Sequence, residues 1–239
     1  MSVAEAVVCL PTYNERENLA RVIDALEPLG VRVLVIDDSS PDGTGELADR
    51  LAAERDWVSV LHRKRKEGLG PAYLAGFREV LRGDAEYVLE MDADLSHDPA
   101  DVPRLIEACA NGADLALGSR YVEGGGTENW DRLRRFVSAG GSFYARTLLG
   151  VPIRDLTGGF KCFRRAVLER IDLDSVHSKG YAFQIELTYR ALRAGCSVVE
   201  VPIVFADRTH GDSKMSRAIF LEAVVRVPAL RLAAVTGRL

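Results

Sequence analysis

Two aspartates that follow a short apolar run are the residues of this chain best suited to chemistry. Tyr87–Met91 is largely apolar and leads directly into Asp92-Ala93-Asp94. On a strand that continued, this i, i+2 spacing would place both carboxylates on one face, where they repel each other and lose solvation. A hard divalent cation would relieve that cost, and Mg2+ in particular is often held by one or two carboxylates together with substrate phosphates. The alternative is an acidic turn that caps the next helix, because Asp98-Pro99 follows and proline favours the first helical position.

Composition limits the class of protein to which these acids belong. The chain has 239 residues, of which 47% are hydrophobic and 28% charged, as is usual for a globular protein with a sizeable core. A net charge of −4 argues against general nucleic-acid binding. Four scattered cysteines without a Cys-x-x-Cys pair predict a reduced, cytoplasmic protein with buried thiols. The sequence predicts neither a signal peptide nor a segment that spans a bilayer.

Strand and helix patterns alternate through the first half of the chain. The strand-like runs are Ala6–Leu10, Val31–Ile36, Val58–Leu61, Tyr87–Met91 and Asp114–Gly118. The helical patterns are Glu15–Leu26, Gly43–Glu54, Leu69–Leu81 and Ala100–Ala110, with Asp42 as a candidate N-cap of the second. Such alternation predicts an α/β fold with a mainly parallel sheet and helices on both faces. Ligands bind such sheets beyond the carboxyl ends of their strands, so we expect the five segments that follow the strands to share one edge.

The second half has a different pattern. It contains a long helical stretch, a short strand, a helix, a strong strand and a helical tail, at Asp131–Leu149, Leu156–Phe163, Tyr181–Ala194, Ser197–Ala206 and Met215–Leu239. Pro228 lies inside the tail and predicts a kink there. Because the chain has no repeat, low-complexity segment or linker, we expect one domain over residues 1–239.

Two further groups of residues are suited to binding a nucleotide and a phosphate. The acids of the turn Asp37–Thr44 can accept hydrogen bonds from a ribose or a base, although a polar turn with a helix cap explains them equally well. Arg120, with Arg134, Arg135 and Ser138, offers forked donors for phosphate oxygens, unless the latter arginines are only the solvated face of a helix. The chain has no Gly-x-Gly-x-x-Gly after its first strand and no P-loop, which disfavours a dinucleotide dehydrogenase or a P-loop kinase.

Seven motifs occur in an order that is typical of one group of enzymes. They are Pro11-Thr12-Tyr13-Asn14-Glu15, the Asp37–Thr44 turn, Gly68-Leu69-Gly70, Asp92–His97, Asp155–Phe160, Ser178–Tyr181 and Asp207-Arg208 to Ser213-Lys214. Over nearly its full length the chain resembles the polyprenol-phosphate (dolichol-phosphate) mannose synthases of glycosyltransferase family 2. The resemblance implies an A-type glycosyltransferase fold with a Rossmann-like central sheet, GDP-mannose as the donor, a polyprenyl (dolichyl) phosphate as the acceptor, and Mg2+ or Mn2+ as the cofactor.

The resemblance also implies roles for individual residues. Residues about 1–122 would form the sugar-nucleotide-binding half, about 123–214 the acceptor-binding half, and about 215–239 a helical tail. The donor-binding residues would be Pro11, Tyr13, Glu15, Ile36, Asp38, Asp92, Ala93, Asp94, Arg208 and Lys214. Asp92 and Asp94 would be the metal ligands, with Asp94 the stronger candidate for direct contact. Some relatives have Gln where this chain has Ser96, and water could fill that third position.

The acceptor phosphate would be bound by Arg120, Arg134 and Ser138, where motif spacing favours Arg134 over Arg135. The catalytic set would be Asp94, Arg120, Arg208 and Lys214, the last two on a loop that closes over the pyrophosphate. The run His62–Lys66 is read mainly as a solvated loop.

We expect direct displacement at the anomeric carbon with inversion. A phosphate monoester is largely dianionic at neutral pH, so no strong base is needed at Gln184 or Glu186, where many family 2 enzymes have an acid. The lipid acceptor implies a peripheral position on the cytoplasmic face of a membrane or contact with an integral-membrane anchor protein, with no nucleic-acid partner. Ile219–Leu239 suits such contact, and it also suits an ordinary core-packing helix. Two alternatives remain open: a UDP-glucose-dependent glucosyltransferase for the same lipid, and a non-catalytic sugar-nucleotide-binding subunit.

Overall fold

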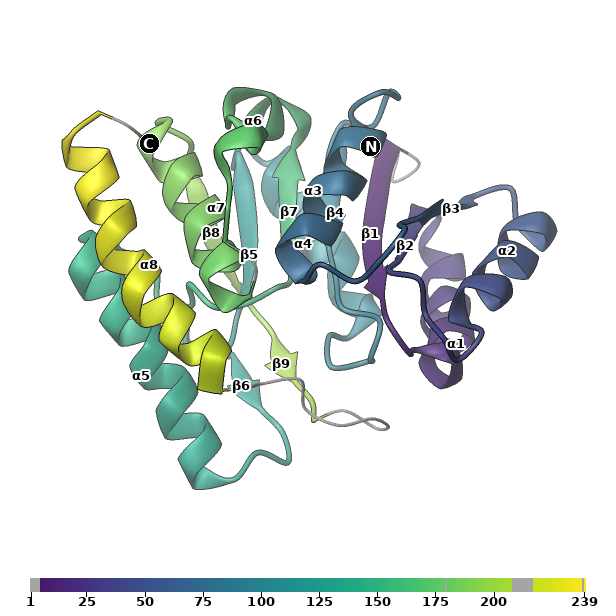
Figure 1. Cartoon of the computed structure of the whole chain (residues 1–239), viewed down its shortest axis with the longest axis horizontal. Helices are drawn as coiled ribbons and strands as arrows, with labels where there is room; N and C mark the ends of the chain where they lie inside the picture. Colours follow the sequence, from purple (N-terminus) through teal and green to yellow (C-terminus); the bar gives the residue numbers. More distant parts are fainter. Residues whose placement is uncertain (1–4, 179, 208–216, 238) are drawn as a thin grey trace.

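A seven-stranded sheet forms the centre of the protein, in the strand order β3-β2-β1-β4-β7-β5-β8 (Figure 1). The computed structural model describes residues 5–178, 180–207, 217–237 and 239. The strands of this sheet are β1 (Ala6–Thr12), β2 (Arg32–Asp37), β3 (Val58–His62), β4 (Tyr87–Glu90), β5 (Leu115–Ser119), β7 (Lys161–Arg164) and β8 (Val198–Pro202). Only β7 is antiparallel to its neighbours in this sheet, so the expected mainly parallel sheet is confirmed.

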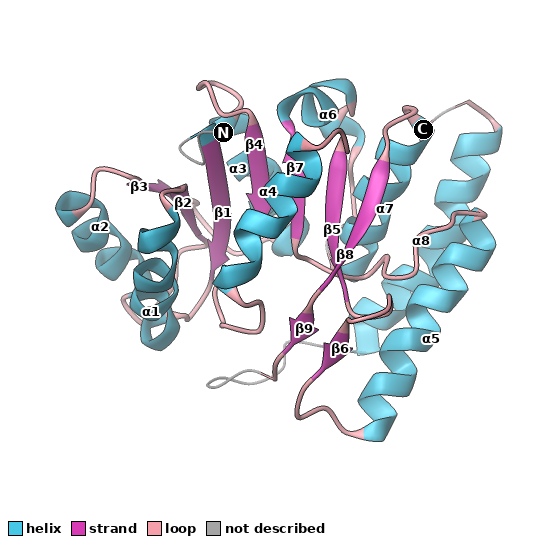
Figure 2. Cartoon of the chain, turned by 180° about the vertical axis from the view of Figure 1, so that it is seen from behind, coloured by secondary structure: helices cyan, strands magenta, loops and turns pink. Residues whose placement is uncertain are grey.

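Helices cover both faces of the sheet (Figure 2). They are α1 (Arg16–Leu26), α2 (Thr44–Glu54), α3 (Leu69–Val80), α4 (Val102–Ala110), α5 (Arg132–Leu149), α6 (Arg165–Arg170), α7 (Tyr181–Arg193) and α8 (Arg217–Val235), with short 3-10 turns at Glu27–Leu29, Pro99–Asp101 and Leu173–Ser175. Alternate residues of β1 show how the core is divided. Val7 and Cys9 face a cluster that contains α3 and α7, whereas Val8 and Leu10 face a cluster that contains α1, α2 and α4.

Three predicted strands have different limits in the structure. β4 ends at Glu90, so the two aspartates lie in a turn and not on a continuing strand. Residues 156–160 form no strand, and the pairing with β4 and β5 begins only at Lys161. The predicted strand Ser197–Ala206 is divided at Ile203, whose N–H donates to Ser119 and whose carbonyl accepts from Gly126. The chain therefore leaves β5 at that residue and pairs with a new strand.

That new pair is a short parallel ribbon of β6 (Gly126–Thr127) and β9 (Val204–Phe205). It lies beyond the carboxyl ends of β5 and β8 (Figure 1). Neither two-residue strand is long enough to show a periodic pattern, which is why the sequence did not predict the ribbon.

The described part of the tail packs against the rest of the protein. α8 runs through Pro228 and lies beside α5 and α7, as both views show (Figures 1 and 2). Val227, Leu230 and Ala234 are buried there, in agreement with the core-packing alternative for this helix. In the part of the chain that the structure describes, no helix has the length and apolarity that are needed to cross a membrane.

Candidate functional site

The acidic turn after β4 holds its two aspartates in different environments. The side chain of Asp94 is buried, and its Oδ1 accepts a hydrogen bond from the backbone N–H of Ser96 at 3.0 Å. Asp92 is partly exposed, and its N–H donates to Nδ1 of His97 at 3.3 Å. The turn is tight, since Leu95 has a positive φ of 61°. Turn geometry, and not strand alternation, thus orients the acids.

The helix-cap alternative holds for a different aspartate. Oδ1 of Asp98 accepts from the N–H of Ala100 at 2.9 Å, at the start of the turn that leads into α4. Asp92 and Asp94 cap no helix, so the capping role does not account for them.

The donors around this turn fit a hard divalent cation. Asp92 and Asp94 supply carboxylate oxygens, and the buried hydroxyl of Ser96 has no hydrogen-bond partner among the described residues. His97 is a poor candidate for a ligand, because its Nδ1 accepts from Asp92 and its ring stacks on Phe160 at 4.9 Å between centroids. The described residues contain no group of three or more His, Cys, Asp or Glu side chains that could hold a metal ion. Two carboxylates would therefore need phosphate oxygens or water to complete an octahedral shell.

Within the basic run after β3, Arg63 is turned inward, whereas His62, Lys64, Arg65 and Lys66 are exposed, so the run is mainly solvated as expected. Arg63 is largely buried and pairs with Asp38 at 2.5 Å, and Nζ of Lys66 lies 3.8 Å from the centroid of the Tyr13 ring. Burial raises the pKa of the Asp38 carboxyl, although the neighbouring Arg63 opposes this shift. Arg63 and Lys66 thus place two cations next to Asp38 and Tyr13, which were predicted to bind the donor.

The other predicted donor-side residues lie at the ends of β1 and β2. Pro11 and Ile36 are paired in the β1–β2 register, and Tyr13 and Glu15 follow β1. Glu15 Oε2 accepts from the Asn18 side chain at 2.9 Å. Asp42 was predicted as the N-cap of α2, but Gly43 occupies that position. Asp42 still contacts the first turn of the helix, because its Oδ1 accepts from the Thr44 N–H at 3.0 Å.

A buried ion pair fixes the orientation of Arg120 on the other side of the site. Its Nε and Nη2 each donate to the Asp155 carboxylate at 2.7 Å, and Nη2 also donates to the Thr157 hydroxyl at 2.9 Å. Burial alone would raise the pKa of the Asp155 carboxyl, but the Arg120 charge and its hydrogen bonds outweigh burial and hold the pKa below its ordinary value. Asp155 is therefore an ionised anchor that sets the plane of the guanidinium.

The remaining acceptor-side residues converge near Arg120. The Ser138 hydroxyl accepts from Tyr121 at 2.7 Å, and the Tyr121 ring lies 5.3 Å from Cζ of Arg120. Arg134 pairs with Asp207 at 2.7 Å, whereas Arg135 reaches outward to the Thr127 carbonyl. Arg208 and Lys214, the other predicted catalytic cations, lie outside the described residues.

Beneath the acidic turn lies a buried polar layer. Glu90 and Lys161 are paired across the β4–β7 register, with Nζ 3.7 Å from Oε2, and Lys161 also donates to the side-chain oxygen of Gln184. Burial raises the pKa of the Glu90 carboxyl to about 7, against the effect of Lys161. Glu186 accepts from the Ser178 hydroxyl at 2.5 Å and pairs with Arg190 at 2.9 Å. Gln184 and Glu186, which lie where many family 2 enzymes have an acid, are thus both engaged in contacts inside the protein.

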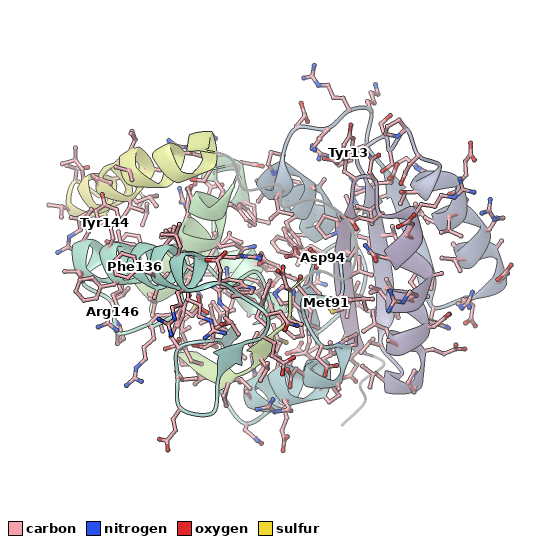
Figure 3. All side chains as sticks on the ribbon, turned by 90° about the horizontal axis from the view of Figure 1, so that it is seen from below. Tyr13, Met91, Asp94, Phe136, Tyr144 and Arg146 are labelled. Carbon is pink, nitrogen blue, oxygen red and sulfur yellow. The ribbon has the colours of Figure 1, made fainter. Side chains whose placement is uncertain are left out.

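Acids and cations from distant parts of the sequence therefore meet at one edge of the sheet. Figure 3 shows this edge, with Tyr13 and Asp94 on the side of the nucleotide half and Phe136, Tyr144 and Arg146 along α5 on the opposite side. An acidic turn suited to a metal diphosphate stands next to forked cations suited to a phosphate monoester.

This fold is that of a glycosyltransferase. The family model described as glycosyl transferase family 2 matches residues 7–172, and the chain belongs to this family. The resemblance to the polyprenol-phosphate mannose synthases is also confirmed. The chain is 53% identical over 224 residues to "Polyprenol monophosphomannose synthase" of Mycolicibacterium smegmatis, and the alignment covers 92% of this chain and 84% of the relative. It is 50% identical over 229 residues to "Undecaprenyl-phosphate mannosyltransferase" of Micrococcus luteus, covering 94% and 93% of the two chains.

Solved structures confirm the A-type glycosyltransferase fold. The glucosyl-3-phosphoglycerate synthase of Mycobacterium tuberculosis, crystallised with Mn2+ and UDP-glucose, aligns with a TM-score of 0.65 at 20% identity. The alignment covers 98% of this chain and 78% of that protein.

Proposed function

We propose that this protein transfers mannose from GDP-mannose to a polyprenyl phosphate, giving polyprenyl phosphate mannose and GDP with inversion at the anomeric carbon. The observation that carries the proposal is the arrangement of an acidic turn, Asp92–Asp94, at the same sheet edge as an anchored arginine cluster. The names of relatives that are 50–53% identical over almost the whole chain support the mannose donor and the lipid phosphate acceptor.

The acceptor phosphate is the nucleophile in this proposal. A phosphate monoester is mostly dianionic at neutral pH, so its oxygen can attack without giving up a proton. Arg120, held in plane by Asp155, and Arg134 would bind that phosphate in line with the bond that breaks. Ser138 would add one hydroxyl donor from the same helix as Arg134.

The engagement of both base candidates agrees with such a nucleophile. Gln184 carries no charge, and Glu186 is committed to Ser178 and Arg190. An ionised carboxylate beside an incoming dianion would repel it, whereas an amide does not. The site therefore supports phosphate as the acceptor group better than it supports a sugar hydroxyl, which would require a base.

Asp92 and Asp94 would hold Mg2+ or Mn2+, with the buried Ser96 hydroxyl beside them. When bound, such an ion supplies positive charge that neutralises the pyrophosphate as it leaves. Arg208 and Lys214 are proposed to bring further cations to the same leaving group. On the donor side, Tyr13, Asp38 and the cations Arg63 and Lys66 would surround the nucleotide.

A lipid acceptor requires access to a membrane, and the protein would bind peripherally on its cytoplasmic face. The exposed apolar surface of α5 and α8 supports peripheral binding. On α5, Leu133, Phe136 and Phe143 are 60–77% exposed. On α8, Val225, Leu232 and Val235 are 65–71% exposed. The segment Arg132–Leu149 contains arginines and no acidic residue, which favours an anionic lipid surface. An integral-membrane anchor protein is the other candidate for this surface.

The proposal is tested with purified protein, GDP-mannose or UDP-glucose, and a polyprenyl phosphate in detergent or vesicles. We expect mannosyl transfer from GDP-mannose, a product of inverted anomeric configuration, and loss of turnover in a chelator. Transfer from UDP-glucose alone would identify the glucosyltransferase alternative. Nucleotide binding without any turnover would identify the non-catalytic subunit.

A further inference from the structure

Four aromatic side chains form a continuous column between the acidic turn and the acceptor-side arginines. The rings of the column are Phe160, His97, Phe205 and Trp130, in that order. His97 stacks on Phe160 at 4.9 Å and meets Phe205 edge-on at 5.1 Å, and Phe205 meets Trp130 edge-on at 5.3 Å. Such edge-to-face contacts hold rings in defined orientations.

Backbone hydrogen bonds fix both ends of this aromatic column. The N–H of Ala206, next to Phe205, donates to the Ser96 carbonyl in the acidic turn at 3.1 Å. The N–H of Glu128, just before Trp130, donates to the Phe205 carbonyl at 2.9 Å. The β6–β9 ribbon thereby ties the position of Trp130 to the turn that carries Asp92 and Asp94.

The Trp130 ring lies within cation–π distance of both acceptor-side arginines. Cζ of Arg134 is 4.3 Å from the ring centroid, and Cζ of Arg120 is 5.6 Å from it. Asp131 is the N-cap of α5, and its side chain accepts from the Arg134 N–H at 2.7 Å, which places Arg134 about one turn after the indole. Arg134 remains about one quarter exposed, so a ligand can reach its guanidinium.

The indole N–H adds a second observation. Trp130 is 8% exposed, and its Nε1 has no hydrogen-bond partner in the described ranges. A buried donor without an acceptor costs free energy that a phenylalanine at this position would avoid. Packing alone therefore does not account for tryptophan here, whereas a cation–π role does, because indole gives the strongest such contact of the aromatic side chains.

We infer that Trp130 is a positioning residue for the acceptor: its ring holds the Arg120 and Arg134 guanidinium groups at the spacing that a phosphate monoester requires. The inference rests on the proposed function in taking these arginines as the acceptor-phosphate site. Trp130 acts through them and does not touch the reacting atoms. The aromatic column and the β6–β9 ribbon hold the indole in place for this role.

The test measures phosphate and nucleotide binding separately. We expect Trp130→Leu to weaken binding of farnesyl phosphate by roughly tenfold and Trp130→Phe by less, because a smaller ring keeps part of the cation–π contact. Binding of GDP-mannose should change by less than about twofold in both variants. In turnover assays the same loss should appear in KM for the acceptor, with kcat much less affected. Trp130→Phe also keeps the test informative if Trp130→Leu does not fold.

The second tryptophan provides a matched control, since the chain has only Trp57 besides Trp130. Trp57 precedes β3, and Trp57→Leu should leave the affinity for farnesyl phosphate unchanged. In a Trp57→Phe variant, Trp130 is the sole tryptophan, and its fluorescence should respond to farnesyl phosphate and not to farnesol, which has the same tail without the phosphate.

Equal affinity of the wild type and Trp130→Leu for farnesyl phosphate would overturn the inference. So would a wild type that binds no farnesyl phosphate, or a response to farnesol of the same size. If farnesyl phosphate binds and Trp130→Leu weakens it, but GDP-mannose gives no transfer, the positioning role stands and only the proposed function fails.

Discussion

Asp94 has two tasks that one substitution can separate. Its Oδ1 accepts from the Ser96 N–H and holds the turn, and its charge is proposed to bind the metal. Asn retains an acceptor oxygen and the same size but removes the charge. We expect Asp94→Asn to lower turnover by at least about 100-fold because transition-state charge is no longer neutralised. The free energy of unfolding should change by less than about 1 kcal/mol, measured by urea denaturation.

Asp98→Asn is the matched control for this prediction. Asp98 lies in the same turn, but its carboxylate caps the next helical segment. Turnover of that variant should stay close to the wild type. Full activity of Asp94→Asn, or of wild type in a chelator, would remove the metal from the proposed function.

Asp155 fixes the orientation of the Arg120 guanidinium. Because this carboxylate is ionised, it should make the stability of the protein depend on pH. Removing one partner of a buried ion pair costs about 3–5 kcal/mol, so Asp155→Asn should lose that much stability at pH 7. Because the native pKa of Asp155 lies below its ordinary 3.8, the ion contributes stability above that pH and loses it as the pH falls through the native pKa. Urea denaturation over a series of pH values from 7 down through the native pKa should show the difference between wild type and variant shrinking in acid. A constant difference would contradict the role of ionised Asp155.

At the scale of elements, the sequence predicted what is local and periodic. The alternating strands and helices of the first half, and the acids after β4, follow from short-range patterns. The β6–β9 ribbon, and with it Trp130 beside Phe205, depends on pairing between segments far apart in the chain, which no local pattern reveals. Arg63 was missed because a basic run looks solvated until tertiary packing brings it to Asp38.

The exposed face of α5 is the element for which membrane binding can be tested. Phe136 and Phe143 are 77% and 60% exposed, and burying a Phe side chain contributes about 1.5–3 kcal/mol. We expect Phe136→Ser/Phe143→Ser to weaken binding to anionic vesicles by at least roughly tenfold, measured by sedimentation. The double variant should keep its turnover with short-chain farnesyl phosphate, since neither ring belongs to the proposed acceptor-phosphate set.

Val199 provides the control for α5. It is also exposed, at 38%, but lies on β8 and not on the α5–α8 surface. Val199→Ser should leave vesicle binding unchanged. If the double variant binds vesicles as well as the wild type does, α5 is not the membrane surface.

At the scale of the whole molecule, β7 joins the two halves. It pairs with β4 of the nucleotide half and with β5 beside the acceptor half, and the fully buried Lys161–Glu90 pair lies across its junction with β4. One core cluster also contains residues from both halves, including Phe77 and Leu149. We therefore propose that residues 1–239 fold as one cooperative unit, although each half contributes a different part of the site.

The two tryptophans make this proposal measurable. Trp57 reports on the first half and Trp130 on the second, so single-tryptophan variants should unfold in urea with coincident midpoints. Lys161→Met removes the cation beside Glu90, whose pKa is already raised to about 7, so the buried carboxyl takes up a proton. We expect both midpoints to fall together, by roughly 1–3 kcal/mol in the free energy of unfolding, because the carboxyl loses its partner. Glu90→Gln/Lys161→Met removes both charges and should recover most of that loss. Midpoints that separate in the wild type, or a Lys161→Met effect confined to one tryptophan, would mean that the halves unfold independently and that β7 does not couple them.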